Sequence, residues 1–172
     1  MKKLLFIFSA LTLVFACSCQ KTEDYVLNEK TFFMVMTNIQ YYPKNYVGKD
    51  LEFDCFTYSL TDVDGNTYTC GVRKCSSGYG CRCGRDTVIG FILNYDGVVP
   101  EPRNQSENTN DKSWVHLKGK IDSDKFTEIT IYAYNGDGID YSTTETIKFL
   151  TFNAESLIVI EDYSSLSYYV TK

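Results

Sequence analysis

Four cysteines lie close together in the middle of the chain, where they could form a chemical centre. They fall within fourteen residues that are rich in glycine: Cys70, Cys75, Cys81 and Cys83. Four thiolates can complete a tetrahedral zinc shell, and glycines let the backbone fold tightly around an ion. The spacing differs from the paired CxxC motifs of zinc ribbons, and exported proteins often use such cysteines for disulfides. Three interpretations stay open: disulfides, bound zinc, and free or redox-active thiols.

Charged side chains surround these cysteines, and we treat them as candidate binding residues: Arg73, Arg82, Arg85 and Asp86. The cations could lower the pKa of a neighbouring thiol or attract an anionic ligand. A nucleophilic cysteine also needs a base, usually a histidine. The chain's one histidine, His116, lies on the polar side of a predicted strand, and no motif places it near the cysteines. We therefore predict no catalytic residues and expect the protein not to be an enzyme.

The N-terminus resembles a bacterial lipoprotein signal. Two lysines precede an apolar run over residues 4–15 that is too short to span a bilayer as a mature helix. Val14-Phe15-Ala16-Cys17 fits the site at which a signal peptidase cuts before a lipidated cysteine. Cys19 is the alternative, because the lysine and acids of residues 20–24 resemble the export tag of some Bacteroidetes surface lipoproteins. An ordinary cleaved secretory signal is a further alternative.

These signals divide the chain into three parts. We expect a signal peptide over residues 1–18, cut before Cys17 or Cys19, a polar tether over 19–27, and one domain over 28–172. The lipid would attach the protein to a membrane of the bacterial cell envelope, on a periplasmic or surface face. A chain of 172 residues has the length of one compact domain of ordinary size.

Periodicity predicts a mainly β fold. Apolar residues recur at helical spacing over 28–42, and Pro43 ends that run. The other patterns indicate strands and turns, with a glycine- and cysteine-rich loop over 71–84; the strands are expected over 51–55, 67–72, 88–95, 114–121, 129–133, 146–152 and 157–160. We predict a small OB-like β-barrel with one N-terminal helix, and a β-sandwich is the alternative.

Composition limits the partners. The formal net charge of −5 argues against a nucleic-acid partner. Hydrophobic residues make up 44% of the chain, which is enough for a packed core. Cys55 alternates with acidic residues in a predicted strand, so we expect it in that core.

Several short motifs, in this order, resemble the YcgQ-like family of exported bacterial proteins of unknown function. They are Tyr46-Val47-Gly48-Lys49, Phe56-Thr57-Tyr58, the cysteine segment leading to Gly90-Phe91, and Trp114-Val115-His116-Leu117-Lys118-Gly119. The resemblance implies an OB-like barrel, a permease or other envelope protein as partner, and for some relatives a link to zinc.

One departure from the family concerns the cysteines. The family's middle motif has two adjacent cysteines, two small residues and an aspartate. Here Cys81 can match the first cysteine, which puts Arg82 in place of the second, or a one-residue shift matches Cys83 and Asp86. The additional Cys70 and Cys75 indicate a site that was changed, or cross-linked by disulfides, in this branch of the family.

The sequence thus predicts a lipid-anchored envelope protein of unknown molecular function. Our first interpretation is a non-catalytic binding protein whose cysteine loop holds zinc for a transport partner. A disulfide-braced surface adhesion or assembly module is the first alternative. A thiol oxidoreductase ranks last, because the cysteines lack a CxxC motif at a helix.

Overall fold

The computed structural model describes residues 24–75, 87–103, 111–134 and 138–170. One α-helix, α1 (Phe32–Tyr41), is followed by a short 3-10 helix, η1 (Pro43–Asn45). The strands are β1 (Tyr25–Leu27), β2 (Asp50–Thr61), β3 (Thr67–Cys75), β4 (Thr87–Asn94), β5 (Trp114–Lys120), β6 (Thr127–Tyr134), β7 (Ile139–Phe149), β8 (Thr151–Val159) and β9 (Tyr169–Val170).

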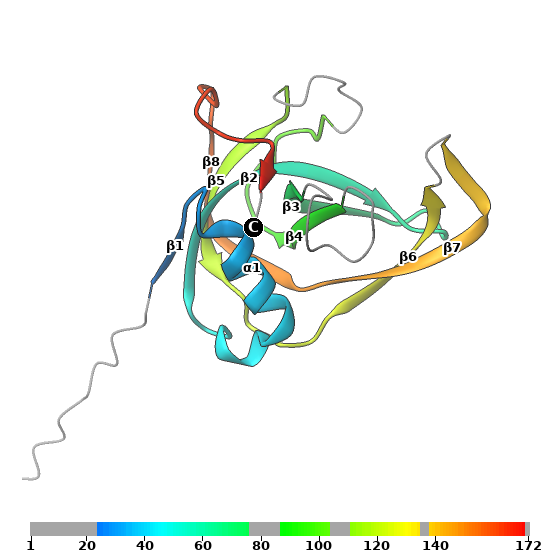
Figure 1. Ribbon diagram of the computed structural model, residues 1–172, viewed down its shortest axis with the longest axis horizontal. Helices are drawn as coiled ribbons and strands as arrows, with labels where there is room; N and C mark the ends of the chain where they lie inside the picture. Colours follow the sequence, from blue (N-terminus) through cyan, green and yellow to red (C-terminus); the bar gives the residue numbers. More distant parts are fainter. Residues whose placement is uncertain (1–23, 76–86, 104–110, 135–137, 171–172) are drawn as a thin grey trace, which may run out of the picture.

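Five strands close into a ring (Figure 1). The order is β2-β5-β8-β4-β3, and β3 pairs again with β2 through the hairpin turn at residues 62–66. β1 and β9 extend the sheet from β2 and β3, while β6 and β7 form a separate two-stranded sheet. The mainly β prediction is confirmed. The ring is not a regular barrel, so the predicted barrel and the alternative sandwich both fit it.

The interior of the ring is filled by apolar side chains at alternate positions along its strands. On β2, Leu51, Phe53 and Cys55 are buried in one core cluster, which confirms the core position predicted for Cys55. Glycine lets the strands approach closely there, because a Cβ on Gly71 would lie 3.0 Å from the Cys55 Sγ atom. On β4, a Cβ on Gly90 would lie 2.0 Å from the carbonyl oxygen of Gly71.

α1 packs its apolar side into this core. Phe32, Met36 and Ile39 are buried and recur at helical spacing. The helix begins later than the predicted residue 28, because the Asn28 side chain accepts hydrogen bonds from the backbone N–H groups of Lys30 and Thr31. Within the described part of the chain, no helix has the length and apolar character needed to cross a membrane.

A second core lies on the outer side of the ring. Ile129 of β6 and Phe149 of β7 are buried with side chains from the ring that include Phe56, Val72 and Trp114. β6 and β7 therefore cover part of the outer wall, and their far ends extend away from the ring (Figure 1).

Two predicted strand boundaries are wrong. Residues 73–75, expected only in the loop, extend the predicted strand over 67–72 to form β3. The predicted strand over 146–152 is divided between β7 and β8 at Leu150. β1 lies within the range predicted for the tether and pairs in parallel with β2.

Candidate functional site

The structure separates two of the four clustered cysteines. Cys70 and Cys75 are both buried on β3, and residues an odd number of positions apart on a strand point to opposite faces. Accordingly, Cys70 belongs to the outer core cluster and Cys75 to the cluster inside the ring. Among the described residues, no three His, Cys, Asp or Glu side chains are grouped to hold a metal ion.

The remaining predicted site residues lie outside the described residues: Cys17, Cys19, Cys81, Cys83, Arg82, Arg85 and Asp86. The four-cysteine centre and the lipidation site therefore stay predictions. Two described thiols are poor nucleophiles. Burial raises the pKa of Cys70 to about 12 and raises that of Cys55 further, because a thiolate loses its hydration inside the protein. This environment is the opposite of the one that activates a thiol.

Arg73 differs most from its prediction. Predicted as a candidate binding residue in the cysteine-rich loop, it lies on β3 with only 1% of its side chain exposed. Its place follows from the strand register. β2 pairs with β1 up to Phe53 and with β3 from Phe56, which leaves a gap along one edge of β2. The Arg73 guanidinium fills this gap.

The Arg73 guanidinium is held by charge, carbonyl groups and aromatic rings. Its Nη2 atom lies 2.7 and 2.8 Å from the two carboxylate oxygens of Glu29 and also donates to the Ser167 carbonyl, while Nη1 donates to the Asp54 carbonyl at 3.4 Å. The Phe32 and Trp114 rings lie 5.3 and 5.1 Å away, within the range of cation–π attraction. The buried Nε atom has no hydrogen-bond partner among the residues that the structure describes.

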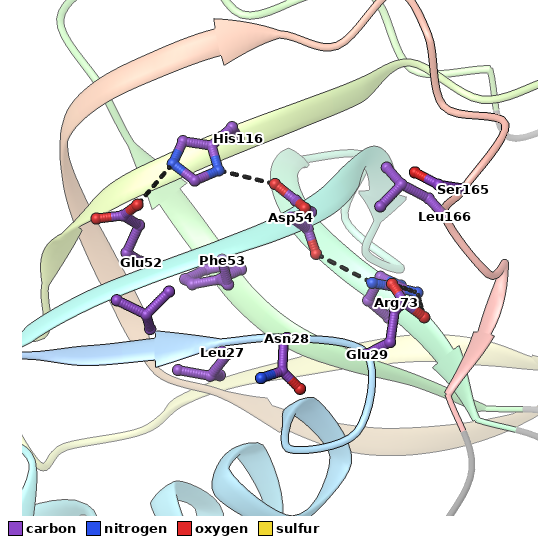
Figure 2. Close-up of a pocket in the computed structure, with 11 residues that line it drawn as sticks. Leu27, Asn28, Glu29, Glu52, Phe53, Asp54, Arg73, His116, Ser165 and Leu166 are labelled. Atoms are coloured by element: carbon purple, nitrogen blue, oxygen red, sulfur yellow. Dashed lines mark hydrogen bonds and ion pairs between the residues drawn. The ribbon is translucent and has the colours of Figure 1, made fainter.

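A second charged group lies beside Arg73 on the outer face of the ring (Figure 2). The His116 Nδ1 atom is 2.7 Å from a carboxylate oxygen of Asp54, and its Nε2 atom is 3.2 Å from one of Glu52. The imidazole therefore lies between two carboxylates, each about one-third exposed. A neutral imidazole can donate to only one of them, whereas a protonated ring can donate to both.

Sequence reasoning did not join these three residues, although a signal for them existed. Glu52 and Asp54 occupy alternate positions of β2, so both point away from the core. In the antiparallel pair of β2 and β5, Asp54 lies directly opposite His116, and Glu52 lies opposite Lys118. Pairing the polar side of residues 50–54 with that of 114–120 would have found the group, but the sequence does not state which strands are neighbours.

One family comparison bears on this chain. The sequence profile of the DUF1980 C-terminal domain, an uncharacterised family, matches residues 15–135, which is more than half of the chain. The chain belongs to this family. Neither the search of curated proteins nor that of solved structures finds a match. The matched segment contains Glu29, Glu52, Asp54, Arg73 and His116, and it ends before β7 and β8.

In this DUF1980 C-terminal domain, the two charged groups line one pocket of about 270 Å³. Its lining comes from β1 and the following turn, β2, β3, β5 and the segment before β9: Val26, Leu27, Asn28, Glu29, Glu52, Phe53, Asp54, Arg73, His116, Ser165 and Leu166. Three carboxylates contribute negative charge, and one of them is already bound to Arg73. The pocket thus joins apolar walls to two partly exposed carboxylates, an arrangement that favours a positively charged group.

Proposed function

We propose that this protein is a non-catalytic binding protein of the bacterial cell envelope, anchored by lipid at Cys17 or Cys19. Its recognition site is the pocket beside Arg73 and His116, and its ligand carries positive charge. The anchor rests on the sequence signals at the N-terminus. The recognition site rests on the position of Glu52 and Asp54, which are partly exposed at the same pocket. That pair of carboxylates is the single observation that carries the proposal.

The charge balance supports a cationic ligand. Glu29 neutralises Arg73 through two close contacts, so the buried cation does not compensate the other acids. When His116 is neutral, Glu52 and Asp54 leave two negative charges at the pocket, and Lys118 approaches Glu52 only to 3.9 Å. Partly exposed charges of this kind attract a ligand of opposite sign at low ionic strength more strongly than at high ionic strength.

The orientation of the imidazole supports a binding role over a hydrolytic one. A histidine that hydrogen-bonds an aspartate through Nδ1 could serve as the base of a Ser-His-Asp triad if its Nε2 faced a hydroxyl. Here the Nε2 of His116 faces Glu52, while Ser165 lies on the other side of the pocket (Figure 2). A carboxylate at Nε2 occupies the place that the nucleophile would need.

Titration of the purified mature domain tests the recognition site. We expect lysine methyl ester and arginine methyl ester to shift the backbone NMR signals of Leu27, Glu52 and His116, and acetate and phosphate to leave them in place. The E52Q/D54N double variant should bind both cationic probes at least tenfold more weakly than the wild type. Equal shifts in the double variant, or shifts by anions only, would contradict the proposal.

The anchor is tested separately on protein isolated from its native membrane. Mass spectrometry of the N-terminal peptide should show an acylated cysteine, and C17A and C19A variants identify which one it is. An unmodified N-terminus after an ordinary signal cut would contradict the anchor without affecting the recognition site.

Zinc at the cysteines is a second candidate function. Cys75 pairs with Thr87 across β3 and β4, so both ends of the segment that carries Cys81 and Cys83 are fixed side by side. Cys70 faces the other core cluster, which favours a set of zinc ligands that does not include Cys70. We expect one zinc in protein purified without chelators, lost in a C75S variant and kept in C70S. Oxidised cysteines without metal would instead support the disulfide-braced adhesion or assembly module, and a reactive thiolate at neutral pH would support the oxidoreductase.

A further inference from the structure

Two adjacent cross-strand rows on the outer face of the ring carry charged residues beside the pocket. One row joins Val26, Glu52 and Lys118 across β1, β2 and β5. The next row joins Asp54, His116 and Ile158 across β2, β5 and β8. Side chains of paired residues project on the same side of a sheet. The acidic pocket is therefore continuous with an aliphatic side chain at each end.

Those two aliphatic side chains are exposed. Val26 is 63% exposed at the β1 end, and Ile158 is 60% exposed at the β8 end. Single exposed aliphatic residues are common, but here they flank partly exposed carboxylates on one face. A free amine or a small inorganic cation would use the carboxylates and leave both aliphatic side chains in water. A polypeptide would cover all three parts at once.

We propose that this face binds a partner polypeptide by receiving one of its lysine or arginine side chains in the pocket. The inference rests on the proposed function and names its ligand. The ammonium or guanidinium group contacts the exposed parts of the Glu52 and Asp54 carboxylates, beside the His116 ring that lies between them, and the aliphatic part of the side chain contacts Leu27 and Leu166. Residues of the partner on either side of the basic residue contact Val26 and Ile158. Binding energy then comes from charge at the centre and from apolar contact at the two ends.

One feature of the fold favours a basic side chain at this position. The chain already binds one basic side chain of its own at the pocket, because Arg73 lies between a carboxylate, two carbonyls and two aromatic rings.

The test uses three probes on the folded mature domain, followed by backbone NMR. The first is a capped pentapeptide with lysine at its centre and valine at each end. The second has norleucine, an uncharged side chain of similar shape, in place of lysine. The third is n-butylammonium, which carries the charge and the aliphatic stem without a backbone. We expect the lysine peptide to bind at least tenfold more tightly than either of the others, and more weakly at 500 mM salt than at 50 mM.

Matched variants locate the binding. E52Q/D54N should weaken the lysine peptide at least tenfold. The control E128Q/E145Q removes the same charge from the exposed β6–β7 sheet and should leave binding unchanged. V26S/I158S should weaken binding of the lysine peptide several-fold and leave binding of n-butylammonium unchanged. A purely electrostatic site would not show this difference. Circular dichroism confirms that each variant is folded.

The outcomes separate the inference from the proposed function. If n-butylammonium binds as tightly as the lysine peptide, the ligand is a free organic cation, so the polypeptide inference fails and the proposed function stands. If the norleucine peptide binds equally well, charge does not direct recognition and both fail. If no probe binds the wild-type domain at millimolar concentration, both fail as well.

Discussion

The two faces of strand β2 are made from neighbouring residues, but packing dominates the energetics of one face and charge dominates those of the other. The inner face presents Leu51, Phe53 and Cys55 to the interior of the ring, where the fit of one side chain to another decides the energy. The outer face presents Glu52 and Asp54 to His116 and water, where charge decides it. The alternation of a strand thus places packed core residues and the carboxylates of the proposed recognition site within five residues of sequence.

This comparison predicts that substitutions one position apart have separate consequences. A change on the inner face should lower the free energy of unfolding and leave the charge of the pocket as it is. A change on the outer face should alter ligand binding at nearly constant stability. Arg73 is the exception that links the faces, since its side chain contacts Phe32 from the interior cluster and Trp114 from the outer one.

The largest effect should come from Phe53→Ala. The Phe53 ring is buried and lies 5.2 to 6.0 Å from those of Phe32, Phe91 and Phe152. Removing it leaves a cavity that the surrounding ring of strands cannot close, so we expect a loss of about 4 kcal/mol in unfolding free energy. Urea denaturation followed by circular dichroism measures it. Val26→Ala on the outer face is the control and should cost less than about 0.5 kcal/mol.

Arg73→Met should cost about 3 kcal/mol, because it removes several hydrogen bonds and two cation–π contacts from a buried position. Glu29 is 38% exposed, so its unpaired carboxylate can regain water, and this limits the cost. Arg73→Lys should recover only part of the loss, since an ammonium cannot make the paired contacts with Glu29. A cost below 1 kcal/mol for Arg73→Met would show that the gap beside β2 closes without the guanidinium.

The inner face could be predicted from the sequence and the outer face could not. Alternating apolar residues identified the β2 core positions and Cys55, because burial leaves a period-two pattern in any half-buried strand. Recognising the His116 group required knowledge that β2 pairs with β5 in one particular register, and sixty-two residues separate Asp54 from His116. A single sequence carries no such pairing information.

Arg73 was misplaced for a related reason. Charged residues are rarely buried, so an arginine in a segment between Gly71 and Cys75 was expected in an accessible loop. Its burial depends on the gap between β1 and β3, and β1 itself was assigned to the tether. Local composition indicated a loop at residues 73–75, whereas pairing with β4 and β9 makes this segment a strand.

Alkaline pH should destabilise the fold through the buried Cys70 thiol. Burial raises the pKa of Cys70 from 9.0 to about 12, so the folded protein keeps a neutral thiol while the unfolded chain ionises. Its stabilising contribution is complete below pH 9 and is lost as the pH rises above 9. Between pH 8 and 10 the loss should be about 1.4 kcal/mol for this one group.

Comparison with a C70A variant isolates that contribution from other groups that titrate in the same range. The unfolding free energy of the variant should fall by about 1.4 kcal/mol less than that of the wild type over the same interval. Parallel curves would mean that the Cys70 thiol ionises as easily in the folded protein as in the unfolded chain, and would contradict its burial.

The smallest effect on stability should come from Glu52→Gln and Asp54→Asn, and it is the most informative about function. Each side chain is about one-third exposed, so solvent screens its contact with His116, and we expect each substitution to cost less than about 1 kcal/mol. The double variant should nonetheless lose at least tenfold in affinity for a basic peptide. Urea denaturation and NMR titration of the same sample give both quantities. If these carboxylates serve stability, the double variant should show a large loss of unfolding free energy. If they serve binding, its unfolding free energy should stay nearly constant while its affinity for the peptide falls.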